Sequence, residues 1–393
     1  MAIPEMSDCD LKGKLVLIRE DFNVPLKNGV ITSDQRIQAA LPTIKQALKA
    51  GAKTVMLMSH LGRPEGAIDE SAFSLAPVAK LLSKLLKMDV PLITDWIDGV
   101  DVGDAKVVLL ENVRFAHGET ENNVELSKRI AGLCDVFIMD AFATSHRTES
   151  STYGAIKYAK EVCAGPLLLS ELRTLEKIMK KPAHPVVAIV GGSKVSTKLS
   201  LLNSLVKTVD YLIIGGGIAN TFLAAEGDTV GKSLYEPDLI DEAERLMVEA
   251  KSRGAEIPVP TDVVVAERLA EGVEGQVRLV SQIDDKEKIF DIGPDTVKRF
   301  VAIIKKAKTI LWNGPIGAFE IEAFSEGTET IAKAIAESKA FKVAGGGDTL
   351  AAIEKYKISD KIDYISTGGG AFLTVLEGKT LPVIAALEDR VEA

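Results

Sequence analysis

Ten short runs of aliphatic and β-branched residues recur along the 393-residue chain, each followed by a segment with helical spacing of apolar residues. The runs lie at residues 15–18, 54–58, 107–110, 136–139, 186–190, 212–214, 263–265, 310–311, 341–344 and 364–365. Strands that alternate with helices predict parallel sheets covered on both faces. Because ten strands exceed one ordinary sheet, we predict an α/β fold of two doubly wound, mostly parallel, Rossmann-like domains.

Residues 165–182 have the pattern of a domain boundary. Gly165-Pro166 interrupts the strand pattern, residues 167–180 have the spacing of one amphipathic helix, and Lys181-Pro182 ends it. The positions predicted to face inward are Leu168, Leu172, Leu175 and Ile178. We predict a first domain over 1–168, a second over 169–380, and a cleft between them. The helix at 167–180 is interpreted as a hinge between the domains, with an ordinary covering helix as the alternative.

The composition excludes several classes of partner. The net charge of −9 disfavours nucleic acid and anionic membranes. Cys9, Cys134 and Cys163 are widely spaced, which argues against a disulfide framework or a structural zinc site. The N-terminus lacks the apolar segment of a signal peptide, and the longest uncharged stretch, 211–225, is shorter than a bilayer span. We therefore expect a cytoplasmic protein, and a monomer.

Four times in the second half, a predicted strand leads into consecutive glycines and then a predicted helix. The loops are Gly191-Gly192-Ser193-Lys194, Gly215-Gly216-Gly217-Ile218, Gly345-Gly346-Gly347-Asp348-Thr349 and Gly368-Gly369-Gly370-Ala371. Glycine lets backbone N–H groups approach a ligand, and the positive end of the following helix favours phosphate. Since such loops meet at the carboxyl edge of a parallel sheet, we predict one phosphate site there. Tight packing is the alternative for any single loop.

These loops differ from two common nucleotide signatures. The chain contains no GxxxxGK[ST] motif, which excludes a P-loop kinase, and no GxGxxG motif followed by an acid about 20 residues later, which disfavours a dinucleotide site.

Several side chains beside these loops are candidates for nucleotide contacts. Lys194 and Lys198 are predicted to share one face of an opening helical turn and to reach phosphates, or to form a solvated face. Asp348, at a helix start, is predicted to hold the Mg²⁺ that accompanies ATP, with a helix N-cap as the alternative. The loop from Asn313 ends in Glu320, which could accept hydrogen bonds from ribose hydroxyls or be a surface charge.

The first half carries arginines, rather than glycines, in its strand-end loops. Four of its six arginines lie there, accompanied by two histidines: Arg36, Arg63, Arg114, Arg147, His60 and His146. Arginine makes planar, bidentate contacts with carboxylate and phosphate. Together these loops suit a small substrate that carries both groups, whereas a surface salt bridge is the alternative for any single arginine.

Eight motifs, in order along the whole chain, strongly resemble the phosphoglycerate kinase family. They are Arg19-Glu20-Asp21-Phe22-Asn23-Val24-Pro25, Ser59-His60-Leu61-Gly62-Arg63-Pro64, Leu110-Glu111-Asn112-Val113-Arg114-Phe115, Asp140-Ala141-Phe142, Gly191-Gly192-Ser193-Lys194-Val195, Trp312-Asn313-Gly314-Pro315, Gly345-Gly346-Gly347-Asp348-Thr349 and Ser366-Thr367-Gly368-Gly369-Gly370-Ala371.

The resemblance implies reversible phosphoryl transfer between 1,3-bisphosphoglycerate and ADP, giving 3-phosphoglycerate and ATP, with Mg²⁺ accompanying the nucleotide. The implied substrate contacts in the first domain are Asp21, Asn23, Arg36, His60, Arg63, Arg114 and Arg147. The implied nucleotide contacts in the second domain are Gly192, Lys194, Lys198, Gly216, Asn313, Glu320, Gly346, Gly347, Asp348 and Thr349. The resemblance also implies that the C-terminal segment 381–393 returns to the first domain. Ala143 replaces a frequent glycine of the family, and would strain its loop if its φ were positive.

The chemistry itself predicts no general base. The attacking carboxylate has a pKa of about 4 and is already ionised at neutral pH, so positioning and charge neutralisation carry the reaction. We assign these roles to Arg36, to Lys198 and to the backbone N–H groups at Gly346 and Gly369. Two rival interpretations are a nicotinamide-dependent dehydrogenase and a non-catalytic protein that closes on an anion.

Overall fold

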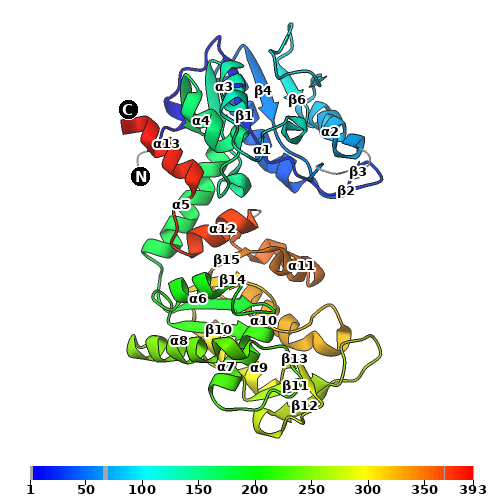
Figure 1. Ribbon diagram of the computed structural model, residues 1–393, viewed down its shortest axis with the longest axis vertical. Helices are drawn as coiled ribbons and strands as arrows, with labels where there is room; N and C mark the ends of the chain where they lie inside the picture. The colour runs from blue at the N-terminus through cyan, green and yellow to red at the C-terminus, as the bar shows by residue number, and fades with distance from the viewer. Residues whose placement is uncertain (1–2, 65–69, 367, 393) are drawn as a thin grey trace. The chain divides into compact units, whose positions relative to one another are not determined.

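The computed structural model describes residues 3–64, 70–366 and 368–392. The chain forms two compact units, Met1–Arg173 with Thr380–Ala393, and Thr174–Lys379. Figure 1 shows both as layered α/β structures. The predicted α/β fold with two mostly parallel sheets is confirmed, because each unit contains one such sheet.

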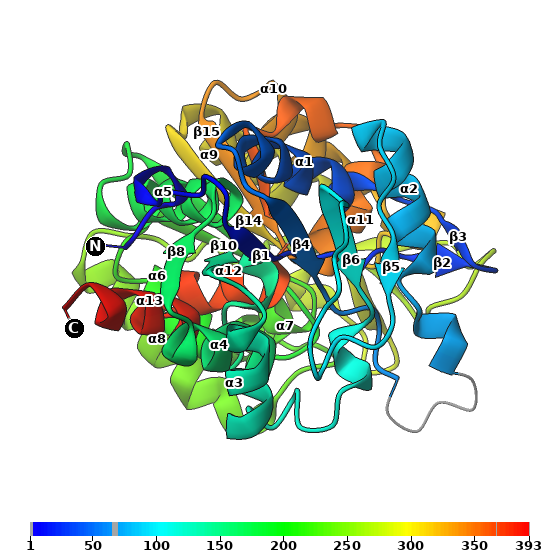
Figure 2. The same cartoon turned by 90° about the horizontal axis from the view of Figure 1, so that it is seen from above.

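The first unit is built on a six-stranded parallel sheet with β1 near its centre. In spatial order the strands are β5 (Leu92–Ile93), β6 (Val107–Leu110), β4 (Thr54–Met58), β1 (Leu15–Arg19), β7 (Val136–Met139) and β8 (Glu161–Ala164). Helices cover both faces: α1 (Gln35–Lys49) and α2 (Ala76–Leu86) on one, and α3 (Val124–Gly132), α4 (Ala155–Tyr158) and α13 (Pro382–Glu392) on the other (Figure 2).

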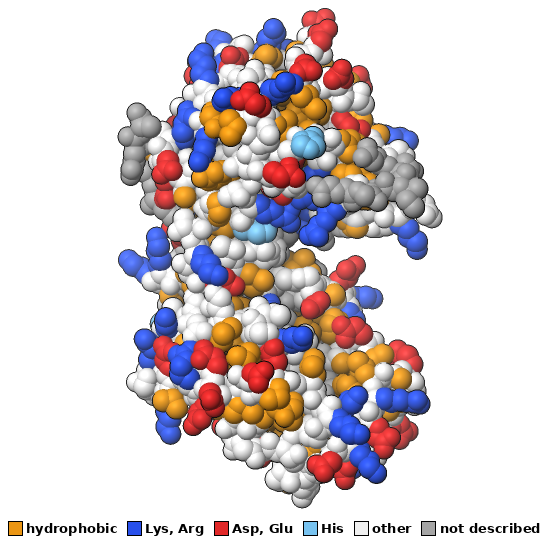
Figure 3. Space-filling view, viewed as in Figure 1, with side chains coloured by type: hydrophobic (Ala, Val, Ile, Leu, Met, Phe, Trp, Pro, Cys, Tyr) orange, Lys and Arg blue, Asp and Glu red, His pale blue; other side chains and the backbone are white. Residues whose placement is uncertain are grey.

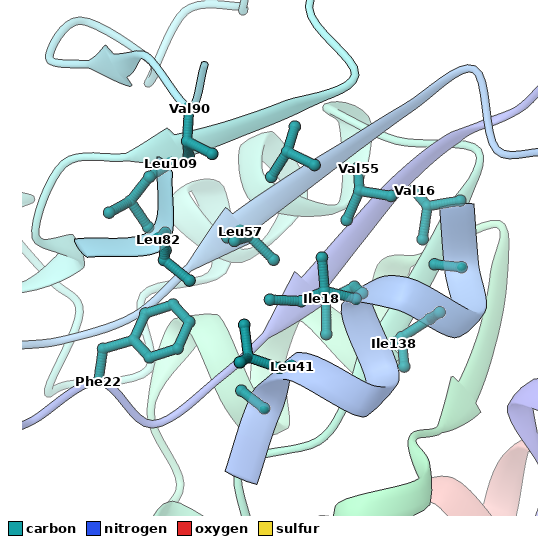
Figure 4. Close-up of a cluster of buried hydrophobic side chains, with 14 of the residues drawn as sticks. Val16, Ile18, Phe22, Leu41, Val55, Leu57, Leu82, Val90, Leu109 and Ile138 are labelled. Atoms are coloured by element: carbon teal, nitrogen blue, oxygen red, sulfur yellow. The ribbon is translucent and has the colours of Figure 1, made fainter. Parts of the chain in front are cut away.

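The core on the α1 side explains why these strands read as continuous apolar runs. Val16, Ile18, Val55 and Leu57 of the sheet and Leu41 of α1 belong to one hydrophobic cluster (Figure 4), and all five are buried. The alternate residues of the same strands are buried as well. A strand that is covered on both faces is apolar at most successive positions, so its pattern shows no alternation.

The second unit contains a five-stranded parallel sheet. Its order is β10 (Tyr211–Gly215), β9 (Val186–Gly191), β14 (Thr309–Asn313), β15 (Phe341–Gly345) and β16 (Tyr364–Ser366). The helices of this unit are α6 (Leu199–Leu205), α7 (Gly217–Ala225), α8 (Ile240–Ser252), α9 (Pro294–Lys306), α10 (Glu326–Glu337), α11 (Gly347–Lys355) and α12 (Gly369–Leu376). Trp312 of β14 lies in a core with Phe300 of α9 and Ile331 of α10.

All ten predicted strands form, but one belongs to a different kind of sheet. β11 (Asp262–Ala266) pairs antiparallel with both β12 (Gln276–Leu279) and β13 (Lys288–Ile292), so its prediction as a parallel strand was wrong. No α-helix separates β11 from β12 or β12 from β13, and a short connection returns the chain antiparallel. The short strands β2 (Leu26–Lys27), β3 (Val30–Ile31), β5, β8, β12 and β13 were not predicted.

Helix α5 (Pro166–Lys180) begins one residue before the predicted start, and the four positions predicted to face inward are buried. The chain passes from the first compact unit to the second within this helix, between Arg173 and Thr174. Its first turn is held by the buried Asp140, whose Oδ1 accepts from Leu168 N at 2.9 Å and whose Oδ2 accepts from Thr43 Oγ1 of α1 at 2.5 Å.

Helix α13 packs on α4 and β8 of the first unit. The guanidinium of Arg390 donates to four backbone carbonyls at the end of α4, at 2.8 to 3.3 Å: those of Ile156, Lys157, Ala159 and Lys160. These bonds satisfy carbonyl groups that the end of a short helix leaves unpaired, so the C-terminal segment is an integral part of this unit.

A buried carboxylate in the second unit makes stability depend on pH. Asp291 accepts from Gly327 N at 2.7 Å and Ile292 N at 2.9 Å, and burial raises its pKa to about 7. Because the folded-state pKa lies above the unfolded value, its contribution to stability is fully present below about pH 4 and is lost as pH rises through about 7.

We therefore expect Asp291→Asn to be less stable than the parent at pH 5, by a few kcal/mol. The deficit should shrink by pH 8, because the parent loses stability as Asp291 deprotonates, whereas the asparagine amide does not titrate. Urea unfolding at both pH values measures the difference, and a deficit that stays constant with pH would contradict the assigned pKa.

Candidate functional site

The glycine loops of the second unit lie together at one edge of its parallel sheet. Gly191 and Gly215 are paired at the ends of β9 and β10, and Gly345 is paired with Ser366. All four predicted loops lead into a helix, as expected, although Thr367 lies outside the described residues.

Two of these glycines have conformations that other residues rarely adopt. Gly346 has φ +100°, and a Cβ there would lie 2.7 Å from Asn313 Nδ2. Gly216 has φ +66°, and a Cβ there would lie 2.7 Å from Gly192 O. A Cβ on Gly347 would instead meet no described atom within 4 Å, and one on Gly369 would approach only Gly346 Cα, at 3.8 Å. The loops therefore pack on one another at Gly216 and Gly346, while open space remains over Gly347 and Gly369.

The two candidate lysines have different surroundings. Helix α6 begins at Leu199, after a turn over residues 196–198, so the predicted position of Lys194 and Lys198 on one face of a helical turn was wrong. Lys198 is partly buried and its Nζ donates to Asn313 Oδ1 at 2.6 Å, whereas Lys194 is exposed. Burial lowers the pKa of Lys198, and the charges of Asp348 and Glu377 oppose that effect.

The Asn313 amide is oriented from both ends. Its Nδ2 donates to Gly345 O at 2.7 Å, which leaves Oδ1 as the acceptor for Lys198. Thr349 Oγ1 accepts from Gly314 N at 2.6 Å, so this buried threonine connects the loop after β14 with α11. Asn313 and Thr349 thus hold the loops in place, a role that was not predicted for them.

Asp348 is exposed in the first turn of α11 and forms no hydrogen bond with any described residue. Its alternative role as a side-chain N-cap is wrong, because Gly346 is the N-cap and no side chain caps the helix. In residues 3–64, 70–366 and 368–392, no group of three or more His, Cys, Asp or Glu side chains is placed to hold a metal. A metal at this edge would therefore need most of its ligands from a bound molecule.

A cavity of about 950 Å³ opens beside these loops. Gly192, Gly216 and Asp348 line it, as do apolar residues that were not predicted, among them Leu234, Phe290, Pro315 and Ala318. The sequence offered one signal for Leu234 as a lining residue, namely an apolar side chain within a loop. In the structure this side chain is 53% exposed. Glu320 is exposed and does not line the cavity.

In the first unit, Arg36 connects two of the predicted loop residues. Its Nη1 lies 2.8 Å from Asp21 Oδ2 and 2.9 Å from Asn23 O. Asn23 Oδ1 in turn accepts from Gly62 N at 2.8 Å, which ties the loop after β1 to the loop after β4. Asp21 and Asn23 therefore position Arg36 and the loop that carries Arg63.

Arg114 and Arg147 converge on one carboxylate. Arg114 Nη2 and Arg147 Nη1 lie 3.0 and 3.4 Å from Glu149 Oε1, and Arg114 Nη1 donates to Gly62 O at 2.6 Å. A cavity of about 480 Å³ is lined by Arg63, Arg114 and Arg147, with His146 and Glu149. Figure 3 shows basic side chains gathered on this unit. Excess positive charge around a small cavity favours an anion.

His60 is nearly fully buried close to these arginines. Burial lowers its pKa well below the ordinary value, and the positive charges of Arg19, Arg114, Arg147 and Arg36 lower it further. The pKa of His146 is also lowered, by burial and then by Arg147. Both rings are therefore neutral at pH 7, which suits hydrogen bonding to an anion better than proton transfer.

Arg19, Glu119, Glu149 and Ser151 were missed as site residues. They form a buried group behind the arginines. Arg19 lies within a matched motif and ends a buried strand, an unusual place for arginine, which was the one available signal. Ala143 lies in a 3₁₀-helix, Phe142–Thr144, and is not among the residues with positive φ, so the expected condition for strain is not met.

Three comparisons with known proteins agree. The family model of phosphoglycerate kinase matches residues 6–379. The phosphoglycerate kinase of Nitratidesulfovibrio vulgaris (strain DSM 19637 / Miyazaki F) is 57% identical over 390 residues, which are 99% of each chain. The structure of phosphoglycerate kinase from Coxiella burnetii is 53% identical, with a TM-score of 0.93 over 99% of this chain and 100% of that one.

A more distant structure has the same fold. The crystal structure of phosphoglycerate kinase from Pyrococcus horikoshii OT3 is 32% identical, with a TM-score of 0.81 and coverage of 99% and 100%. No helix among the described residues is long and apolar enough to cross a membrane. From its sequence along nearly the full length and from its fold, the chain belongs to the phosphoglycerate kinase family.

Proposed function

We propose that this chain transfers a phosphoryl group reversibly between 1,3-bisphosphoglycerate and ADP, giving 3-phosphoglycerate and ATP. The observation that carries the proposal is the presence of two different candidate anion sites in one chain. An arginine-lined cavity of about 480 Å³ lies in the first unit, and a glycine-edged cavity of about 950 Å³ beside a partly buried lysine lies in the second. A simple anion-binding protein has no need of the second.

In this proposal the first unit holds 3-phosphoglycerate. Arg63, Arg114 and Arg147 bind its phosphate, and Arg36 faces its carboxylate. His60 donates a hydrogen bond as a neutral ring, while Asp21 and Asn23 hold Arg36 in place. Arginine suits both anionic groups because its planar fork matches two oxygens at once.

The second unit holds the nucleotide. The apolar lining of the larger cavity, including Leu234 and Phe290, suits a purine base, since ligand cavities are mostly apolar with a few polar groups. Backbone N–H groups at Gly192, Gly216, Gly346 and Gly347 face the phosphates, with Lys194 nearby. Glu320 is the proposed contact for the ribose hydroxyls, although it lies outside the cavity lining.

The reaction then depends on positioning and charge. The carboxylate oxygen of 3-phosphoglycerate attacks the γ-phosphorus of ATP, and the bond to the ADP oxygen breaks in line. Arg36 and Lys198 neutralise charge on the migrating group, and N–H groups at Gly346 and Gly369 bind its equatorial oxygens. Since the reacting groups belong to different units, transfer requires the units to enclose both substrates and exclude water. Helix α5 and the segment 370–381 are the proposed hinges.

Asp348 is the proposed protein ligand of Mg²⁺. A single exposed carboxylate without a hydrogen-bond partner among the described residues fits an ion that arrives with the nucleotide, since such Mg²⁺ uses one or two carboxylates plus phosphates. When bound, the ion neutralises phosphate charge. The net charge of −9 supports the absence of nucleic acid and membrane partners, and we propose a cytoplasmic monomer.

We expect Asp348→Asn to raise the Mg²⁺ concentration for half-maximal rate by about tenfold or more, because one anionic ligand is lost. The measurement is a Mg²⁺ titration at fixed ATP, with the exposed Asp360→Asn as the matched control. An unchanged Mg²⁺ dependence would remove Asp348 from the metal site.

The proposed function is tested by coupled assays in both directions, one oxidising and one reducing a nicotinamide reporter. We expect turnover with 3-phosphoglycerate and ATP, and none when glycerate replaces 3-phosphoglycerate. Binding of 3-phosphoglycerate without turnover would identify a non-catalytic anion-binding protein instead.

A further inference from the structure

Among the described residues, the His60 ring makes one hydrogen-bonding contact with another side chain, and that contact determines which of its nitrogens carries the proton. Nδ1 lies 3.4 Å from Arg19 Nη2. A guanidinium has five N–H donors, no acceptor, and does not lose its proton in proteins. Nδ1 must therefore accept, and the single proton of a neutral ring lies on Nε2. Among the residues that the structure describes, no hydrogen bond to Nε2 is found.

Arg19 is fully buried at the end of β1, and its guanidinium is held by hydrogen bonds. Its Nε donates to Ser151 Oγ at 2.9 Å, and its Nη1 donates to the backbone oxygen of Glu20. These two bonds fix the plane of the guanidinium, so Nη2 has one direction in which to point. That direction is toward His60.

The buried carboxylate of Glu119 orients Ser151, the residue that accepts from Arg19 Nε. Ser151 Oγ donates to Glu119 Oε1 at 2.5 Å, and Ser151 N donates to Glu119 Oε2 at 2.9 Å. Because the hydroxyl proton is used on Glu119, the lone pairs of Ser151 Oγ are available to Arg19. Ser151 lies in a π-helical turn, Ser150–Gly154, a rare conformation that occurs often at functional sites.

The charges around the ring also keep it neutral. Arg19, Arg36, Arg114 and Arg147 all disfavour a protonated His60, and burial acts in the same direction. Glu119 and Glu149 instead stabilise the charge on Arg19. The same guanidinium thus directs the ring and opposes its protonation.

We propose that Arg19, held by Ser151 and Glu119, is a positioning residue that locks His60 in its Nε2–H tautomer and directs a neutral donor toward the substrate anion. The identity of that anion rests on the proposed function. Arg19 itself acts through His60, and the lock exists before any substrate binds.

The decisive measurement is a long-range ¹H–¹⁵N correlation spectrum of the full-length, substrate-free protein labelled with ¹⁵N-histidine. The chain has four histidines, so His60→Gln assigns the signal. We expect a pyridine-type shift for Nδ1 and a pyrrole-type shift for Nε2, unchanged from pH 6 to pH 8. A protonated Nδ1 in the parent protein would overturn the proposal.

Variants separate a lock from mere packing. Arg19→Met keeps an unbranched apolar stem without donors, and should give averaged shifts from both tautomers. Ser151→Ala, a smaller change, should give partial averaging if Arg19→Met does not fold. The control is Arg129→Met, an exposed arginine of α3, which should leave the spectrum unchanged. A fixed Nε2–H signal in the Arg19 or Ser151 variant would show that the tautomer is set elsewhere.

Kinetics provide the functional readout. The KM for 3-phosphoglycerate should rise about tenfold in Arg19→Met, the cost of one misdirected hydrogen bond to an anion, while the KM for ATP stays unchanged. An unchanged KM for 3-phosphoglycerate would remove the positioning role. Because the spectrum is recorded without substrate, a locked tautomer in a protein that lacks kinase activity would refute the proposed function and leave the lock standing.

Discussion

Replacing Arg36 by alanine is expected to lower kcat about 10³-fold in either direction, because a charged donor at the migrating phosphoryl group is lost. Arg36 is held 2.8 Å from Asp21 Oδ2 at the start of α1, so its guanidinium is preorganised rather than recruited from solvent. The KM for the nucleotide should stay within about twofold of the parent value, since the nucleotide cavity is lined by the other unit. Steady-state kinetics with each substrate varied in turn measure both effects.

Two variants make the Arg36 result specific. Arg36→Lys retains the charge but loses the planar fork, and should recover only part of the rate. Arg129→Ala removes an exposed arginine from the same unit and should leave kcat unchanged. A parallel loss of nucleotide affinity in Arg36→Ala would instead overturn the division of binding between the two units.

The strands could be predicted from the sequence because their pattern depends on burial on both faces. Every predicted strand forms, and the runs at 15–18 and 54–58 differ from β1 and β4 by at most one residue. Which sheet a strand joins depends on its connections. Residues 263–265 have the same β-branched composition as the parallel strands, but short links to β12 and β13 place them in an antiparallel sheet.

Candidate site residues could be named from the sequence only where a short segment carries both the side chain and a recognisable pattern. Arg63 and the glycine loops satisfied that condition, as did Arg36 at the start of its helix. Arg19 and Ser151 did not, because their contact joins residues 132 positions apart. Contacts of that range follow from how strands and loops pack together, and no local pattern in the sequence encodes them.

Lys194 and Lys198 illustrate the same limit within one turn. Four residues apart, they were predicted to share one face of a helical turn, whereas the loop before α6 exposes Lys194 and partly buries Lys198. Lys198 Nζ is held by Asn313 Oδ1, whose own orientation is fixed by Gly345 O. A held, partly desolvated ammonium group stabilises a developing charge more than a solvated one.

We therefore expect Lys198→Met to lower kcat by about 10²- to 10³-fold, because its charge is used mainly in the transition state. Lys194→Met should change the KM for ATP by only about threefold, because an exposed lysine attracts phosphates through a high dielectric. The two variants control for each other, because each removes one positive charge from the loop before α6. Steady-state and single-turnover kinetics distinguish binding from chemistry. Equal losses of kcat in the two variants would mean that the loop as a whole, rather than the partly buried Lys198, stabilises the migrating phosphoryl group.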